Sequence, residues 1–443
     1  MLSVPDLLGV DPLWIATGIL VAVYALLISE KVNRAILAML GAALMVLFGI
    51  INQQQAVAGI DANTLALLIG MMVIVGITSR CGLFQYVAIK AAKSVKARPT
   101  GILIMLTLIT AVFSAFLDNV TTVLLIAPIT LLITEALETR VYPFFIAEIL
   151  ASNIGGTATL IGDPPNIIIG SAAGLSFNQF LFNLGPIAAI CLAVVIVIIY
   201  LLSRKELSTI PQSASDRIMK FRENEAITDT PLMIKSLSVL ALVLLGFTLG
   251  HGYGIQPGTS ALAGAALLML LAFGHHRGDK QGDCVRRILA EVEWVTIFFF
   301  GGLFILVAGV EHVGLLEFFA AKILELTDGD LMATSFLIFW ASGILSAILD
   351  NIPFVATMIP LIESTAGTFG GPDAIEPLWW SLALGACLGG NGTLLGASAN
   401  LTVAAFAEKA KQPIHFMDFV RVAFPIMLLT LAISNLYLWL RYF

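Results

Sequence analysis

Two aspartates lie in nearly the same sequence context in the two halves of the chain. Asp118 lies in SAFLDNVTTVLLIAP (114–128) and Asp350 in SAILDNIPFVATMIP (346–360), where seven of fifteen aligned positions are identical. Long apolar runs flank both. A carboxyl group at the centre of a bilayer costs about 2.5–3.5 kcal/mol on insertion scales, so it is functional by default. Its chemistry would be uptake and release of a proton or a cation. The structural alternative is an N-cap on the following helix, but Asn or Ser would cap without a charge.

A glycine-rich segment follows each aspartate at similar spacing. GGTATLIGDPPN (155–166) and GGNGTLLGASAN (389–400) agree at six of twelve positions, and Asp163 in the first corresponds to Ala397 in the second. Proline removes amide donors and interrupts a helix, which leaves carbonyls and half-helix ends available to a ligand. Non-helical backbone at membrane depth is tolerated only where it is buried or lines a cavity. We therefore predict helix breaks at Gly155, Gly156, Gly162, Pro164, Pro165, Gly389, Gly390 and Gly396.

The composition indicates what must position these residues. The chain has 443 residues, of which 59% are hydrophobic and 12% charged, and its mean hydropathy is +0.98. Soluble proteins carry about 25% charged residues, so this is a polytopic membrane protein. A net charge of -6 without a basic cluster argues against nucleic acid as a partner. Scattered cysteines and histidines predict neither a disulfide framework nor a metal site. The acidic N-terminus predicts no cleaved leader.

The aligned segments recur at offsets of 232 and 234 residues. They predict a tandem duplication, with repeats at 13–202 and 232–441 joined by a polar cytoplasmic linker at 203–231. Hydropathy predicts the same order of elements in both halves. The predicted elements are helices near 13–29, 32–51 and 63–80, an amphipathic piece at 82–93, an apolar stretch at 99–135, an interrupted helix at 142–171 and a helix at 184–202; the second half repeats them near 232–250, 257–273, 294–310, 314–325, 332–365, 379–407 and 420–441.

The placement of basic residues predicts the topology. Each long apolar stretch could be one helix or a re-entrant hairpin with the aspartate at its tip. With hairpins, 21 of the 23 Lys and Arg residues fall on one side, and only Lys322 and Arg441 on the other. The positive-inside rule favours this arrangement, with the basic side cytoplasmic and both termini outside. Five crossings per half make the repeats inverted. We therefore expect an all-α polytopic membrane protein of two inverted repeats and about ten transmembrane helices.

Inverted repeats with discontinuous helices are typical of secondary transporters, which bind substrate near the membrane midplane. In this topology every Lys and Arg is expected in a loop or at an interface, and Glu148 is expected near the cytoplasmic interface. Aspartates without a basic residue at midplane favour a proton, a cation or a neutral polar solute. Half-helix N-termini can still hold anions, so an anion stays an alternative.

The segment NIGGTATLIGDPPNIIIGS (153–171) and the paired Leu-Asp-Asn tips (117–119 and 349–351) resemble the ion transporter superfamily. Within it, the chain is similar over its whole length to the arsenical-pump membrane subunit (ArsB) and to P-protein-like permeases. The resemblance implies extrusion of arsenite and antimonite by proton antiport across the bacterial cytoplasmic (inner) membrane. It implies no cofactor besides the proton gradient, and a possible soluble ATPase subunit as partner. Asp replaces the Ser expected at the tips of the sodium-coupled dicarboxylate branch, which favours proton handling.

When the functional positions of the family are carried over onto this sequence, the resemblance implies a site for substrate binding and proton coupling at the two tips and the two breaks. Arsenite near neutral pH is mostly an uncharged trihydroxide. Amide and hydroxyl side chains would bind its hydroxyls while the aspartates exchange protons, and Cys387 is expected only to pack. The expected site residues are Asp118, Asn119, Thr159, Asp163, Asn166, Asp350, Asn351, Thr393 and Asn400.

Three other functions stay open on this evidence. The scaffold could serve a sodium/proton antiporter or an anion permease. An intramembrane aspartyl protease with Asp118 and Asp350 as its dyad belongs to another class, since two aspartates can share one proton. The protease motif Gly-x-Gly-Asp is absent from the chain, so we expect a transporter and not an enzyme. We expect alternating access, with the two hairpin-and-break units rocking around a shared site.

Overall fold

The computed structural model describes residues 9–29, 31–208, 210–275 and 277–443, and within them the regular elements are all helices. The expectation of no cleaved leader concerns residues that lie largely outside this range. The α-helices are α2 (Pro12–Ser29), α3 (Arg34–Leu47), α4 (Gln53–Ala58), α5 (Ala62–Ser79), α6 (Leu83–Ser94), α7 (Pro99–Phe116), α8 (Asn119–Leu137), α9 (Tyr142–Thr157), α10 (Pro164–Ala172), α11 (Phe177–Leu207), α12 (Gln212–Met219), α13 (Thr230–Leu249), α14 (Pro257–Phe273), α15 (Asp279–Ala290), α16 (Trp294–His312), α17 (Leu315–Leu326), α18 (Leu331–Ile348), α19 (Asn351–Phe369), α20 (Glu376–Gly389), α21 (Ser398–Lys409) and α22 (Phe416–Tyr442).

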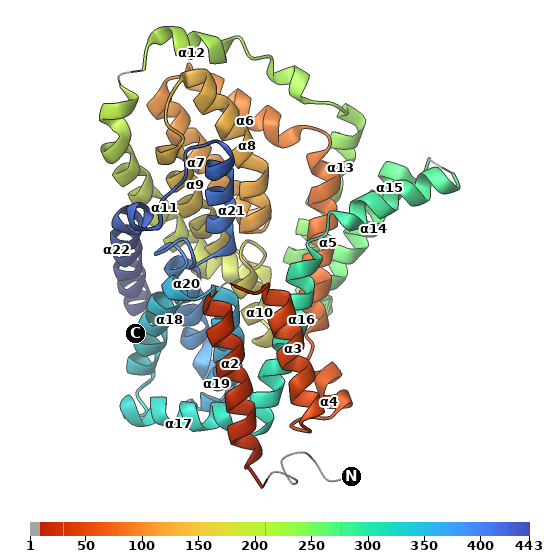
Figure 1. The fold of residues 1–443 in the computed structure, drawn as a ribbon, viewed down its shortest axis with the longest axis vertical. Coiled ribbons are helices and arrows are strands. Elements are labelled where there is room, and N and C mark those ends of the chain that lie inside the picture. Colours follow the sequence, from red (N-terminus) through yellow and green to blue (C-terminus); the bar gives the residue numbers. More distant parts are fainter. Residues whose placement is uncertain (1–8, 30, 209, 276) are drawn as a thin grey trace.

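Both long apolar stretches form hairpins. Only Leu117 and Asp118, in extended conformation, separate α7 from α8, and Leu349 and Asp350 separate α18 from α19. Hairpin 1 (α7–α8) begins and ends at the end of the molecule that carries α6 and α12, whereas hairpin 2 (α18–α19) begins and ends beside α17 (Figure 1). The two hairpins therefore enter from opposite sides, and their tips lie near the middle.

The interrupted helices link the two repeats. The first breaks between α9 and α10, and the second between α20 and α21. Within each repeat, the first hairpin arm packs against the helix before the break: α7 against α9 and α18 against α20. Beyond the break the packing crosses between repeats, because α10 contacts α19 and α21 contacts α8. Each hairpin is thus held partly by the other repeat, and any site at the tips is shared.

Gly155, Gly156 and Gly389, predicted as helix breaks, are in fact helical residues of α9 and α20, because the chain leaves the helix only after Thr157 and Gly389. Gly155 and Gly389 make the close approach of these helices to the hairpins possible. A Cβ on Gly155 would lie 2.2 Å from the carbonyl oxygen of Ala111 in α7, and one on Gly389 would lie 2.3 Å from that of Gly343 in α18. Real Cβ atoms essentially never approach a backbone atom so closely. Small residues let membrane helices pack backbone to backbone. The glycines therefore bring the helix before each break, α9 or α20, directly against the first arm of its hairpin.

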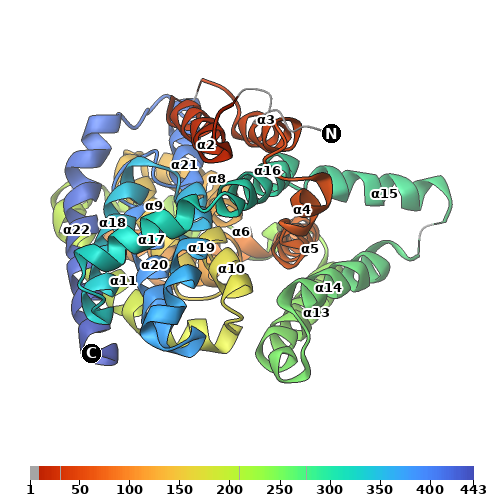
Figure 2. The same ribbon diagram turned by 90° about the horizontal axis from the view of Figure 1, so that it is seen from below.

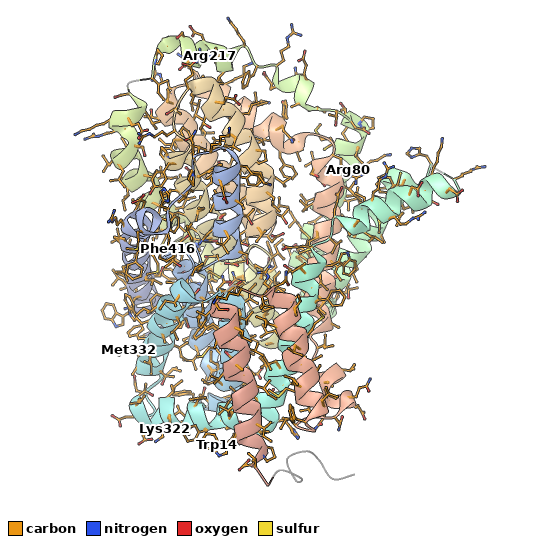
Figure 3. The ribbon with its side chains drawn as sticks, in the orientation of Figure 1. Trp14, Arg80, Arg217, Lys322, Met332 and Phe416 are labelled. Carbon is orange, nitrogen blue, oxygen red and sulfur yellow. The ribbon has the colours of Figure 1, made fainter. Side chains whose placement is uncertain are left out.

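Ten helices of the described residues are long and apolar enough to span a membrane. The number agrees with the expected ten, but the helices are partly different ones. Four of the ten are hairpin arms, whereas α3 and α14 are shorter apolar helices and the broken helices are not among the ten. Figure 3 shows Arg80 and Arg217 toward one end of the molecule and Trp14 and Lys322 at the other, as the predicted separation of the two sides requires.

Three regions add to the expected elements. The turn between α2 and α3 lies about halfway along the molecule (Figure 1). Helices α13 and α14 stand at one flank of the bundle, and α15 projects from it (Figure 2); neither α15 nor α4 was expected. The segment 203–231 includes the end of α11 and the helix α12, which packs against α6 and α8. The boundaries of the repeats and the linker stay predictions.

Candidate functional site

The tip aspartates cap the second arm of each hairpin. Asp118 accepts a hydrogen bond from the backbone N–H of Thr121 at 2.8 Å and another from the Thr121 hydroxyl. Asp350 accepts one from the N–H of Ile352 at 3.3 Å. Both aspartates therefore do act as N-caps, the structural alternative considered for them from the sequence. This role leaves the second oxygen of Asp350 for a different partner, described below.

A buried network of asparagines connects the tip of hairpin 1 with both breaks. The Asn119 amide donates to Asn153 Oδ1 at 3.1 Å and to Asp163 Oδ1 at 3.3 Å. The Asn153 amide donates to Asn391 Oδ1 at 3.0 Å and to Asn400 Oδ1 at 2.9 Å. Asn153 and Asn391 were not among the predicted site residues. Asn153 thus joins the two repeats at the centre of the molecule.

Asn166 and Asn400 hold the broken helices in shape. The Asn166 amide donates to three backbone carbonyls of the first break, the shortest being that of Thr159 at 2.9 Å. The Asn400 amide donates to the carbonyls of Gly390 at 2.7 Å and Thr393 at 2.8 Å. Their donors are therefore occupied in this conformation. The predicted contact of both residues with a solute stays a prediction.

Thr159 and Thr393 tie each break to its own hairpin. The Thr159 hydroxyl donates to the carbonyl of Ala115, and that of Thr393 donates to the carbonyl of Ala347 at 2.6 Å. Cys387 does more than pack, because its thiol donates to Asn166 Oδ1 at 3.4 Å. The two threonine contacts join each break to its own hairpin, whereas the Cys387 contact crosses between the repeats.

The predicted residues with free hydrogen-bonding capacity meet in a small cavity. Asp163 and Asn351 both line it, together with Asp118 and Asn119, and its volume is about 20 Å³. Among the described residues, Asp163 Oδ2 and Asn351 Nδ2 are buried without a hydrogen-bond partner. A water needs about 10–15 Å³ by this kind of measure. The centre has room for about one water, so a larger solute needs the tips to separate.

Arg34 corrects the expected charge of the site. It was expected in a loop, but its guanidinium lies at the tip of hairpin 2, 3.2 Å from Asp350 Oδ2. It also donates to the hydroxyls of Ser398 at 2.5 Å and Thr296 at 2.8 Å, and lies 3.5 Å from Glu293 Oε1. The prediction failed because α3, which begins at Arg34, starts about halfway along the molecule (Figure 1), and the tip of hairpin 2 lies within hydrogen-bond distance of its first residue.

A larger cavity of about 440 Å³ leads to this cluster, and Tyr24, Arg34, Glu293, Asp350 and Ser398 are among its lining residues. The linings of the two cavities together carry four carboxyl groups and one guanidinium. Arg34 is already paired with two of those carboxylates. The site can therefore bind protons, and it offers amide and hydroxyl groups to a polar solute. An anion would need Arg34 to be released first.

Opposed re-entrant hairpins, two broken helices and a buried polar centre define a polytopic membrane transporter. The profile of the citrate transporter family, CitMHS, matches residues 24–385. The chain belongs to this family.

Several of its relatives are named as transporters, and one as a membrane protein. A Mycobacterium tuberculosis protein named as an uncharacterised transporter is 42% identical over 433 residues, covering 97% of this chain and 98% of the relative. The human P protein is 35% identical over 504 aligned residues, covering 96% of this chain but 59% of its own length. Among solved structures, the Alcanivorax borkumensis YdaH transporter superposes with a TM-score of 0.62 at 13% identity and 97% coverage of both chains. That likeness supports the fold alone.

The sequence contained signals for some of the unpredicted site residues. Asn153 opens the same glycine-rich motif that carries Asp163, and Asn391 lies inside the second break. Arg34 and Glu293 each lie next to an apolar run, but their depth depends on how the scaffold helices pack. No sequence pattern indicated that Ser398 would contact them.

Proposed function

We propose that this protein is a secondary transporter that exports arsenite and antimonite in exchange for protons. The coarser statement, a membrane transporter of the CitMHS family, rests on the profile match and the relatives. The observation that carries the finer proposal is the polar centre between the tips. Its amides and carboxyl groups suit an uncharged, hydroxylated solute and exchangeable protons.

The charge of the site supports a neutral cargo. With all groups ionised, the four carboxylates outnumber the one guanidinium, and Arg34 already contacts Asp350 at 3.2 Å and Glu293 at 3.5 Å. An anion would meet this excess of negative charge in a site of low dielectric, where repulsion is strong. A trihydroxide avoids that repulsion, and it can donate to Asp163 Oδ2 and accept from Asn351 Nδ2.

An organic anion is the second candidate, and Arg34 is the observation that favours it. A guanidinium suits bidentate binding of a carboxylate, and the matching family profile is described as that of citrate transporters. Anion binding at Arg34 would require the Asp350 carboxylate to be protonated or displaced. The same excess of carboxylates over Arg34 would also suit a cation, so the vesicle assay below includes sodium.

The mechanism we propose is alternating access of two hairpin-and-break units. The crossed packing of α10 on α19 and of α21 on α8 couples movement of one hairpin to the other repeat. Protonation of Asp118 and Asp350 would remove the charge that each tip presents to the centre. The aspartates would release their protons when cargo enters on one side and bind protons again when cargo has left on the other, so that the two fluxes run in opposite directions.

Everted membrane vesicles test the proposal. We expect an imposed proton gradient to drive arsenite accumulation, and Asp118→Asn to abolish it while the protein still folds and inserts. Asp163→Ala should be milder, because Ala397 occupies the related position. Gradient-driven uptake of citrate instead of arsenite would select the anion candidate. Sodium accumulation without either would reject both.

A further inference from the structure

Glu148 is a buried carboxyl group that the site above does not use. It lies in α9, was expected at the interface, and is in fact only 1% exposed. The Thr130 hydroxyl of α8 donates to its Oε1. Its other oxygen, Oε2, has no hydrogen-bond partner among the described residues. A carboxyl group in such surroundings is costly unless it performs a function.

The second repeat shows that the architecture does not need this polar pair. At the offsets of 232 and 234 established above, Thr130 corresponds to Ile362 and Glu148 to Leu382. Both of those side chains are fully buried. The same packing position between hairpin and broken helix is thus apolar in one repeat and ionisable in the other.

Hydroxyl groups follow the same ridge of α8 on either side of Thr130. Counting by four from Asp118, the ridge holds Thr122, Ile126, Thr130 and Thr134, about 6 Å apart at each step. Thr122 Oγ1 is also buried and unpartnered within the described chain. The related ridge of α19, which begins at Asp350, holds Phe354, Met358, Ile362 and Ala366.

The polar ridge ends in a cavity at the basic end of the molecule. Thr134 lines this cavity of about 790 Å³, and its hydroxyl donates to the Thr130 carbonyl at 2.8 Å. Arg140 and Lys409 line it too; both belong to the side predicted to be cytoplasmic. The cavity lies between the ends of α8 and α21, which run side by side (Figure 1).

From this arrangement we propose that Glu148 is a proton-binding site on a separate proton route, which runs along hairpin 1 from the cytoplasmic cavity through Thr134 and Thr130 and ends at Glu148, because the buried Ile126 interrupts the ridge toward Asp118. The inference rests on the proton coupling proposed above. A proton from water in the cavity adds to the carboxylate and gives the carboxylic acid; its return to water restores the carboxylate. Protons would use this route at the cytoplasmic side, while cargo uses the cavity at Arg34.

Other ionisable groups on the surrounding helices do not pair with Glu148 through any hydrogen bond or ion pair in the described chain. Helix α7 carries none. The groups on the remaining helices packed against α9 are Glu135 on α8; Cys191, Tyr200, Arg204, Lys205 and Glu206 on α11; Glu376 and Cys387 on α20; Glu408 and Lys409 on α21; and Asp418, Arg421, Tyr437, Arg441 and Tyr442 on α22. The charge state of Glu148 therefore depends on its burial, on Thr130 and on access from the cavity.

Infrared difference spectroscopy of the purified protein tests the site without reference to cargo. We expect a pH-dependent carbonyl band of a protonated carboxylic acid that disappears in Glu148→Gln. Glu135→Gln, an exposed glutamate on α8, is the matched control and should leave the band intact. If Glu148→Gln leaves the pH-difference spectrum unchanged, Glu148 does not bind a proton and the proposal is wrong.

Transport assays then separate this proposal from the proposed function. We expect Glu148→Gln to lose gradient-driven arsenite accumulation but to keep arsenite–arsenite exchange, which moves no net proton. The double variant Thr130→Ile with Glu148→Leu copies the second repeat and guards against a folding defect. If that variant folds and accumulates arsenite like wild type, the route is refuted even though proton coupling stands. If wild-type accumulation ignores the proton gradient, the proposed function fails, while the infrared result still decides whether Glu148 binds protons.

Discussion

The contact between Arg34 and Asp350 should restrain the tip of hairpin 2. Arg34 belongs to α3, whereas Asp350 lies at the tip of hairpin 2, and their charged atoms lie 3.2 Å apart with side chains 23% and 25% exposed. At an effective dielectric constant of 20, the gross attraction at that distance is about 5 kcal/mol. Desolvation and ordering of the side chains reduce it, and a charge-assisted hydrogen bond contributes about 1.5–3 kcal/mol net. We expect a coupling energy in that range.

A cysteine at Ile352 reports the opening of the tip. Ile352 is 4% exposed and lines the small cavity, so alkylation of Ile352→Cys requires the tip to move. We expect Arg34→Gln to speed alkylation roughly 10–160-fold, the ratio that corresponds to about 1.5–3 kcal/mol. The half-buried native Cys284 serves as internal reference, because labelling is measured as a ratio to it.

A double-mutant cycle isolates the pair. Asp350→Asn should speed alkylation in the same range, and the double variant should be no faster than the faster single variant, because each change removes the same contact. Arg421→Gln is the matched control, since Arg421 forms an exposed pair with Asp418 at 3.3 Å and such pairs contribute little. If the rate increases caused by the two single substitutions multiply in the double variant, the two side chains do not act through one contact and the proposed restraint is refuted.

Three further predictions concern the breaks, the centre and the basic side. Gly155→Ala should lower the free energy of unfolding, measured by thermal denaturation, by about 1–3 kcal/mol or more, because the new Cβ would lie 2.2 Å from a carbonyl oxygen of α7. Gly301→Ala is the control and should be neutral, because the space around Gly301 is open. Equal effects of the two substitutions would contradict the packing argument. Asn153→Leu removes both hydrogen bonds that the Asn153 amide donates to the second break and should abolish arsenite accumulation in vesicles, so near-normal uptake would show that this network is dispensable. The hydrogen bond from Lys93 holds the pKa of Glu223 below its ordinary value of 4.5, so this contact between α6 and the 203–231 segment is present above that ordinary pKa and is lost as pH falls through the lowered one. In limited proteolysis, the 203–231 segment of Glu223→Gln should therefore be cut faster than that of wild type at pH 7, and the difference should disappear in strong acid. Equal rates of cutting at pH 7 would contradict a stabilising role for the Lys93–Glu223 contact.

The sequence was sufficient for the features that depend on local patterns. The repeated Leu-Asp-Asn tips and the balance of basic residues predicted the two hairpins, because a single long helix would have scattered the positive charges over both sides. The glycine-rich motifs likewise predicted both broken helices. Internal repetition made each of these predictions testable against its counterpart in the other half.

Features that depend on packing between distant segments could not be predicted in this way. The position of Arg34 follows from where α3 begins and from its hydrogen bonds to Asp350, Ser398 and Thr296. Glu148 was placed near the interface from its position along α9, but α8 and the neighbouring helices cover it completely. The occupied amides of Asn166 and Asn400 likewise became visible only when the backbone carbonyls of the breaks were in place.

Counting protons against arsenite in proteoliposomes tests the central claim most directly. Purified protein would be reconstituted with a pH-sensitive dye inside, and arsenite flux would be measured together with the internal pH. The account predicts that each arsenite leaving one side is accompanied by protons moving the opposite way, and that Asp118→Asn abolishes both fluxes. Arsenite movement without any proton movement, or proton-coupled movement of citrate while arsenite stays put, would contradict it.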